Sequence, residues 1–274
     1  MTDLETHDHT HEDAWRAILT GEARGLQVTR KLVGWMPAGP RCKLCLAPLR
    51  PPGSVLLKIV GFGPSRLNRR LCRACFRAVE KTPGGAEIEL SFLFADIRGS
   101  TSLAEHIPAQ EYSKLISRFY GKAAEVVDRQ DGLVDKFVGD EVVALFVPGF
   151  VDGNPAEKAI EAARGLLRET GNDGGDPWIP VGAGVHTGVA YVGRVGEGDA
   201  CDFTAVGDAA NLTARLASEA GAGEILVSSA AAEAAGLETH GLEIRTLELR
   251  GREKAVDAWV ARAETLTVSS AAAE

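Results

Sequence analysis

The sequence predicts an α+β fold, in which helices pack on a largely antiparallel sheet, preceded by a small four-cysteine metal-binding segment. From Glu87 onward, short apolar runs typical of strands alternate with amphipathic stretches typical of helices. Two of these strands flank Gly139-Asp140, which is a hairpin signal. Ahead of them, four of the five cysteines form two Cys-x-x-Cys pairs.

The composition narrows the function class. The 274 residues carry 30 Lys and Arg against 38 Asp and Glu, a net charge of −8, and the pI is about 5.4. Phosphate backbones and anionic lipids are held by concentrated cationic charge, so we expect no nucleic-acid partner. No apolar run approaches the roughly 20 residues of a membrane span, and the acidic N-terminus does not resemble a signal peptide. We therefore expect a cytoplasmic protein without a membrane span.

The N-terminal region divides into a tail and a helix. Residues 1–12 contain three histidines among acids and threonines and show no apolar periodicity, which predicts a disordered, solvated tail, with metal binding as the alternative. Residues 13–35 carry apolar residues at helical spacing and predict an amphipathic helix that is interrupted near Gly25.

Residues 36–85 form the four-cysteine segment, which is rich in Pro, Gly and Arg and contains one short strand-like run at 54–60. So few apolar residues cannot make an independent core, so a bound metal is expected to hold the segment together. The number and paired spacing of the cysteines favour structural zinc, with Cys42, Cys45, Cys72 and Cys75 as ligands. A redox or iron–sulfur role and unligated cysteines remain alternatives.

Residues 86–262 are predicted to form the main domain, and residues 263–274 a second disordered tail. The expected elements of the main domain are, in order, a strand at 88–95, a helix at 108–128, hairpin strands at 133–138 and 141–147, a helix at 155–169, a strand pair around His186-Thr-Gly188, a helix at 208–220, and strands near Ile225 and Trp259.

Asp96 stands at the end of an apolar strand, just before Gly99, Ser100 and Thr101. This turn can present free N–H groups to phosphate oxygens while the carboxylate holds a hard cation. A surface turn with Ser100 as a helix N-cap is the structural alternative.

Two further patterns combine polar side chains. Lys136 and Asp140 are expected on one strand face about 13 Å apart, too far for one phosphate to contact both. The alternative is that Gly139-Asp140 only forms the turn of the hairpin. Asn211 and Arg215 lie four apart and share a helix face, which in isolation is also typical of a surface pair.

Together, in this order and spacing, these motifs and His-Thr-Gly resemble the catalytic domain of the class III nucleotidyl cyclases, the adenylate and guanylate cyclases, over roughly Glu87 to Arg262. The resemblance implies a ferredoxin-like-type cyclase domain. It also implies a lyase of the signal-transduction class, in which the ribose 3′-hydroxyl of a nucleoside triphosphate attacks the α-phosphate with the help of two metal ions and releases pyrophosphate.

The resemblance also assigns residues. Asp96 and Asp140 match the aspartates that hold two Mg²⁺ or Mn²⁺ ions, and Asn211 and Arg215 match the residues that orient the ribose and stabilise the transition state. Arg250 matches a basic residue for the terminal phosphates. His186 is expected to be structural.

The resemblance also assigns the choice of base to Lys136 and Thr204, since adenylate cyclases of this type commonly pair Lys with Asp or Thr and guanylate cyclases commonly pair Glu with Cys. Lys can donate to the adenine N1 acceptor, whereas guanine presents a donor at the same edge, so ATP is favoured and the expected product is cyclic AMP. Guanylate cyclase activity and a catalytically weak nucleotide-binding or dimerisation module are the alternatives.

Two features of the family complete the expectation. Gly182 stands where the family often has an arginine that contacts phosphate, so turnover is lowered or another cation, such as Arg98 or Arg194, substitutes. Family members share each site across a head-to-tail dimer, and this chain carries both sets of residues, which implies a homodimer with two composite active sites.

Overall fold

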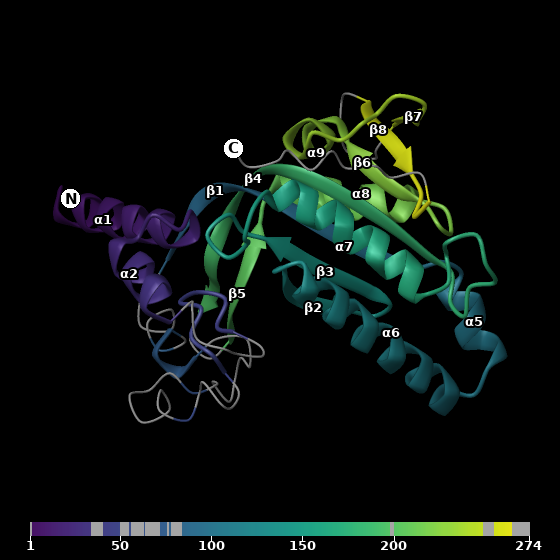
Figure 1. Ribbon diagram of the computed structural model, residues 1–274, viewed down its shortest axis with the longest axis horizontal. Coiled ribbons are helices and arrows are strands. Elements are labelled where there is room, and N and C mark those ends of the chain that lie inside the picture. Colours follow the sequence, from purple (N-terminus) through teal and green to yellow (C-terminus); the bar gives the residue numbers. More distant parts are fainter. Residues whose placement is uncertain are drawn as a thin grey trace. The chain divides into compact units, whose positions relative to one another are not determined.

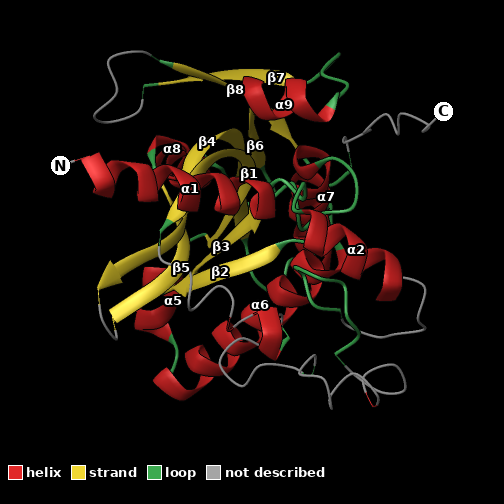
Figure 2. Cartoon of the chain, turned by 90° about the vertical axis from the view of Figure 1, so that its left-hand side faces the viewer, coloured by secondary structure: helices red, strands yellow, loops and turns green. Residues whose placement is uncertain are grey.

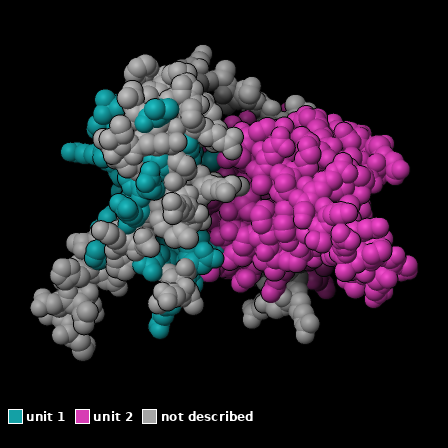
Figure 3. Space-filling view, turned by 90° about the horizontal axis from the view of Figure 1, so that it is seen from below, with its two compact units in different colours: residues 1–88, 148–150, 191–204 teal, residues 89–147, 151–190, 205–274 magenta. Residues whose placement is uncertain are grey.

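A computed structural model of the chain describes residues 2–33, 41–49, 55, 63, 72–75, 77, 84–197, 200–248 and 255–264, without side chains at 2–10, 200 and 201. The chain forms two compact units, which are coloured separately in Figure 3. Unit 1 comprises residues 1–88, 148–150 and 191–204, and unit 2 comprises residues 89–147, 151–190 and 205–274.

A single eight-stranded sheet is the main feature of the fold (Figures 1 and 2). Its strands are β1 (Gly85–Ile97), β2 (Leu133–Val138), β3 (Glu141–Phe146), β4 (Val181–Glu197), β5 (Ala200–Val206), β6 (Ile225–Ser228), β7 (Glu243–Leu247) and β8 (Val256–Ala261). They are ordered β2-β3-β1-β4-β6-β8-β7, and β5 pairs with β4. The pairs β1–β3, β2–β3, β6–β8 and β7–β8 are antiparallel, and β4–β6 is parallel. The predicted α+β fold with a largely antiparallel sheet is confirmed.

The helices of unit 2 are α5 (Ser100–His106), α6 (Ala109–Arg129), α7 (Pro155–Glu169), α8 (Asp208–Glu219) and α9 (Ser229–Ala235). Alternating residues of β6 show how they form layers. Ile225 and Val227 join the core with α6, α7 and α9, whereas Leu226 packs with Leu212 and Leu216 of α8. Because successive strand residues face opposite sides, α8 covers the sheet face opposite to the other three helices.

Unit 1 contains α1 (Thr2–Leu19) and α2 (Arg24–Val33). The carbonyl of Leu19 accepts a hydrogen bond of 2.6 Å from the Gly149 N–H. A Cβ at Gly149 would lie within 2.7 Å of the backbone at the end of α1, so glycine permits this close approach. Trp15 of α1 is 1% exposed and its ring stacks on Phe203, with the centroids 5.8 Å apart.

The N-terminal region differs from the expectation in two ways. The helix α1 begins at Thr2, within the stretch where the sequence predicted a disordered tail; acidic residues near its N-terminus and the Glu12–Arg16 ion pair one turn apart both favour a helix. The helical region breaks at Gly21 rather than Gly25, because Gly21 takes the left-handed conformation at φ +83° while Gly25 lies inside α2.

The predicted main domain follows the expectation at most elements. His186-Thr-Gly188 lies inside the one long strand β4 rather than in a strand pair, and β5, α9 and β7 were not predicted. The run at 54–60 and the C-terminal tail from 265 lie outside the described residues, apart from Val55. Within the part of the chain that is described, no helix has both the length and the apolar character to span a membrane.

Candidate active site

Asp96 lies at the end of β1, on the sheet face opposite to α6 and α7. Its neighbours Ala95 and Ile97 are buried in the core beneath those helices, so the Asp96 side chain points the other way. In the sheet, Asp96 is in register with Glu141, the first residue of β3. The side chain is 26% exposed.

Asp140 reaches the same place from the β2–β3 hairpin. It forms a two-residue loop with Gly139, whose φ of +62° favours glycine. The carboxyl group of Asp140 lies close enough to that of Asp96 to raise its pKa. The sequence-based expectation that Asp140 continues the β2 face is therefore wrong, because the residue lies in the turn and not in the strand.

The electrostatics of this cluster show an excess of negative charge. Burial and the neighbouring Asp140 carboxyl raise the pKa of Asp96 to about 6, although Arg98 opposes the shift. Burial and the charges of both aspartates raise the pKa of Glu141 to about 7. Burial, followed by the same two charges, also raises the pKa of Tyr112. Sequence reasoning missed Glu141, which joins this cluster through its register with Asp96.

The donor set fits a divalent cation. The Oδ1 atom of Asp96 is buried and has no hydrogen-bond partner among the described residues, an arrangement that is costly unless the atom meets a cation or a donor. Carboxylate oxygens are the ligands that Mg²⁺ and Mn²⁺ prefer. The alternative that Ser100 caps the helix after a simple surface turn is weakened, since the N-cap of α5 is Gly99 and makes no side-chain hydrogen bond.

Tyr120 of α6 holds the hairpin that carries Asp140. Its hydroxyl donates a hydrogen bond to the Gly139 carbonyl, and its ring stacks on Phe137 of β2 at a centroid distance of 4.1 Å. Two contacts from one side chain fix the position of a loop that would otherwise depend on its own backbone.

Lys136 stands on the same hairpin, after a bulge at Asp135. The bulge shifts the register by one residue, so Lys136 faces the same side as Val143 and Glu141. Its ammonium is 3.3 Å from the Asp135 carboxylate, which is only 2% exposed, while Lys136 is 42% exposed. The bulge could not be read from the sequence pattern.

The helix α8 places Asn211 and Arg215 one turn apart, with Asn211 exposed and Arg215 half-buried. Glycines on β4 allow α8 to lie close to the sheet. A Cβ at Gly184 would be 2.4 Å from the Ala217 nitrogen, and a Cβ at Gly182 would be 2.7 Å from the Ala220 carbonyl oxygen. Glycine therefore stands at position 182, where the family often has an arginine, for a steric reason: no side chain fits there.

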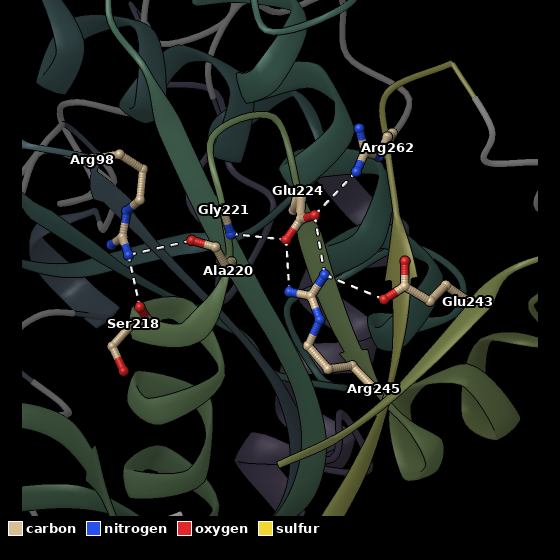
Figure 4. Close-up of polar contacts among 8 residues, drawn as sticks. All are labelled: Arg98, Ser218, Ala220, Gly221, Glu224, Glu243, Arg245 and Arg262. Carbon is tan, nitrogen blue, oxygen red and sulfur yellow. Dashed lines mark hydrogen bonds and ion pairs between the residues drawn. The ribbon is translucent and has the colours of Figure 1, made fainter.

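Arg98, in the loop after β1, reaches the end of α8 (Figure 4). Its Nη2 pairs with the Oδ2 of Asp96. Its Nη1 donates to the carbonyls of Ser218 at 2.8 Å and Ala220 at 3.3 Å. Arg98 is thus already engaged by protein groups.

The remaining predicted site residues are Thr204, Arg250 and His186, of which the structure describes Thr204 and His186. Thr204 is buried in β5 and belongs to unit 1, whereas Lys136 belongs to unit 2. Arg250 lies outside the described residues. His186 contacts the Ser228 hydroxyl at 2.8 Å, in keeping with a structural role.

The four cysteines do come together. All four are buried, and their sulfur atoms lie within 4.8 Å of one another. The Cys72 amide donates to the Cys42 sulfur at 3.2 Å and the Cys75 amide to the Cys72 sulfur at 3.4 Å. Arg30 of α2 donates to the Leu44 carbonyl beside the cluster at 2.9 Å. Four converging thiols with paired spacing can bind a metal ion.

Comparison with known proteins identifies the domain. Residues 86–261 match the family described as the adenylate and guanylate cyclase catalytic domain. The chain belongs to this family. The match covers more than half of the chain and includes every strand of the sheet, apart from the first residue of β1.

Two individual relatives are also similar to this chain. An uncharacterised protein of Mycobacterium tuberculosis (strain ATCC 25618 / H37Rv) is 37% identical over 134 residues, which are 48% of this chain and 24% of that protein. An adenylate cyclase of Anabaena cylindrica is 33% identical over 134 residues, 46% of this chain and 26% of that protein. The chain therefore spans about a quarter of the length of these curated relatives.

Solved cyclase structures share the fold. The guanylyl cyclase Cya2 is 29% identical with a TM-score of 0.59, covering 68% of this chain and 100% of that one. The adenylyl cyclase CyaB from P. aeruginosa is 26% identical with a TM-score of 0.54, covering 64% of this chain and 94% of that one.

Proposed function

We propose that the chain is an adenylate cyclase, which converts ATP to 3′,5′-cyclic AMP and pyrophosphate in signal transduction. The observation that carries the proposal is the convergence of Asp96 and Asp140, with a buried Asp96 oxygen that lacks a partner among the described residues. A domain that only bound a partner protein would have no use for this costly arrangement.

Each residue has a role in the proposed reaction. Asp96 and Asp140 would hold two Mg²⁺ or Mn²⁺ ions, which when bound supply Lewis-acid activation of the ribose hydroxyl and the phosphates. Asn211 would orient the ribose, and Arg215 would stabilise the negative charge that develops on the α-phosphoryl oxygens. Arg250 would bind the terminal phosphates.

Lys136 and Thr204 would choose the base. The exposed Lys136 ammonium can donate to adenine N1, whereas guanine would oppose it with a donor. The similarity to the Anabaena adenylate cyclase supports ATP. The similarity to the guanylyl cyclase Cya2 supports GTP as the second candidate.

A competition assay tests substrate and mechanism together. The protein is incubated with Mn²⁺ and equal ATP and GTP, and both cyclic products are measured. We expect cyclic AMP to predominate and Asp140→Asn to abolish it, while Asp152→Asn, which changes an exposed aspartate of unit 2, leaves it intact. Predominant cyclic GMP would favour the second candidate. Full activity of Asp140→Asn would overturn the metal assignment. Nucleotide binding without product would indicate the catalytically weak nucleotide-binding or dimerisation module.

We also propose that Cys42, Cys45, Cys72 and Cys75 bind one structural zinc ion. Four reduced thiols in close contact fit a reducing compartment such as the cytoplasm. Elemental analysis should find about one zinc per chain, lost in Cys72→Ser and kept in Cys201→Ser, which changes a cysteine that belongs to neither Cys-x-x-Cys pair. Iron with visible absorbance would indicate an iron–sulfur cluster instead.

A further inference from the structure

Arg98 lies between Asp96 and the end of α8, which carry residues that the proposed homodimer assigns to its two composite sites. Its backbone N–H donates to Pro180, just before β4, at 2.9 Å. Its guanidinium joins Asp96 to the carbonyls of Ser218 and Ala220 at the end of α8, and the side chain is 21% exposed. The terminal carbonyls of a helix lack intrahelical donors and carry partial negative charge, so a cation is favoured there.

The end of α8 is held firmly from its other side. Glu224 accepts a hydrogen bond from the Gly221 N–H at 2.9 Å and two from Arg245, at 2.8 and 3.2 Å. Figure 4 shows this network beside the carbonyls that Arg98 contacts. Because the turn after α8 is fixed, the contacts of Arg98 with this turn also fix where its guanidinium holds the Asp96 carboxylate.

The two oxygens of the Asp96 carboxylate have different surroundings. Oδ2 pairs with Arg98, while the buried Oδ1 has no partner among the described residues. Arg98 therefore orients the carboxylate with one oxygen available, but it also keeps a positive charge beside the place where a divalent cation would bind.

We propose that Arg98 is a positioning residue that ties Asp96 to the end of α8, the helix of Asn211 and Arg215, and that it moderates divalent-cation affinity. It aligns the two sets of site residues that one chain contributes to the two composite sites, at the cost of weaker metal binding. The part of this inference that concerns turnover rests on the proposed cyclase function, whereas the part that concerns metal affinity does not.

Two opposing effects decide the sign of the metal prediction. Releasing Asp96 from Arg98 frees side-chain torsions, which must be fixed again when a metal binds. Removing the Arg98 charge relieves its repulsion of a doubly charged ion, and this repulsion is stronger in a partly buried site than in bulk water. Repulsion is the larger effect, so loss of the charge should tighten metal binding.

The test compares two substitutions of Arg98. Free Mn²⁺ is followed by electron paramagnetic resonance during titration of the full chain without nucleotide, and kcat and KM are measured separately. Arg98→Met removes the charge and the donors and should lower the Mn²⁺ Kd by roughly tenfold and lower kcat. Arg98→Lys keeps the charge but not the forked geometry, so it should keep a near-native Kd and still have a reduced kcat.

Arg129→Met is the matched control, because Arg129 pairs with Glu169 on the helical layer; it should change neither quantity. Unchanged or weaker Mn²⁺ binding in Arg98→Met would overturn the charge role, and a native kcat in both Arg98 variants would overturn the positioning role. If Arg98→Met does not fold, a native kcat in Arg98→Lys alone overturns positioning, and a Kd shifted as far as tenfold in Arg98→Lys overturns the charge role. Should the wild type turn over neither nucleotide, the Mn²⁺ titration still decides the charge role while the proposed function fails.

Discussion

At the scale of single residues, Gly182 shows how local packing can replace a functional side chain. The helix α8 approaches β4 so closely that a Cβ at this position would lie 2.7 Å from the Ala220 carbonyl oxygen and 2.9 Å from that of Gly221. Arg98 donates to the same Ala220 carbonyl. The cation in this neighbourhood thus comes from the loop after β1 and not from β4.

Gly182→Arg should not restore a more active enzyme. We expect it to destabilise unit 2 by about 1–3 kcal/mol, because the new side chain overpacks a site that is closed by backbone atoms. Urea denaturation measures this loss. Gly25→Ala is the control, since no atom lies within 4 Å of its Cβ position in α2 and alanine favours a helix by about 1 kcal/mol. A stable Gly182→Arg protein with raised turnover would contradict this account.

Glu224 predicts an acid-dependent stability. Its hydrogen bonds with Arg245 hold its pKa below the ordinary value, against the opposing effect of burial. For a carboxyl with a lowered folded-state pKa, the stabilisation is present above the unfolded pKa of about 4.3 and is lost as pH falls through the folded pKa.

Glu224→Gln should therefore cost about 1–3 kcal/mol at pH 7, and the difference from the wild type should shrink below about pH 4. Denaturation at both pH values measures this change. Glu243→Gln, a more exposed partner of Arg245 at 3.4 Å, should show a smaller effect. An equal cost at both pH values would show that the Glu224 charge contributes nothing.

At the scale of elements, α1 is anchored through Trp15. The ring is buried and stacks on Phe203, which precedes Thr204 in β5. Trp15→Ala should destabilise unit 1 by about 3–5 kcal/mol, while Trp15→Phe, which keeps a ring, should lose less. Thermal unfolding followed by circular dichroism measures the loss. A change in the ATP-to-GTP preference of Trp15→Phe would show that α1 also positions Thr204, whereas equal stability of Trp15→Ala and the wild type would contradict the anchor.

The elements that could be predicted are those with strong local signals. Asn154 caps α7 with its side chain and Pro155 occupies the first turn, so this helix has the bounds that the sequence indicated. The strand β7 was missed because Glu243, Arg245 and Thr246 make it polar and it lies at the sheet edge. The short helix α9 was missed because its alanines carry little periodicity.

The motifs in the sequence led us to expect Asp96 and Asp140 in one metal site, and the two residues do lie close together. The roles of both residues stay predictions. Other features of the site depend on residues far apart in the chain. Arg98 contacts carbonyls 120 and 122 residues away, and Glu141 joins the cluster only through sheet register. No local pattern encodes such contacts, so sequence reasoning could not find them.

At the scale of the whole molecule, the proposed homodimer makes a prediction about mixed variants. Asp140→Asn and Arg215→Ala should each be inactive alone, because each removes one half of every composite site. An equal mixture should recover about a quarter of the wild-type activity, since half of the dimers would be mixed and each would hold one intact site. No recovery after subunit exchange, in a mixture that forms dimers, would indicate that each site is built within one chain.

The long strand β4 crosses the boundary between the two compact units, since residues 181–190 belong to unit 2 and residues 191–197 to unit 1. Protein modules joined by a linker can be exchanged by recombination at that linker. Here an exchange at residue 85 would carry away the helices that contact Gly149 and Phe203. A new N-terminal module could replace the present one only with matching changes in two separate segments of the domain it precedes.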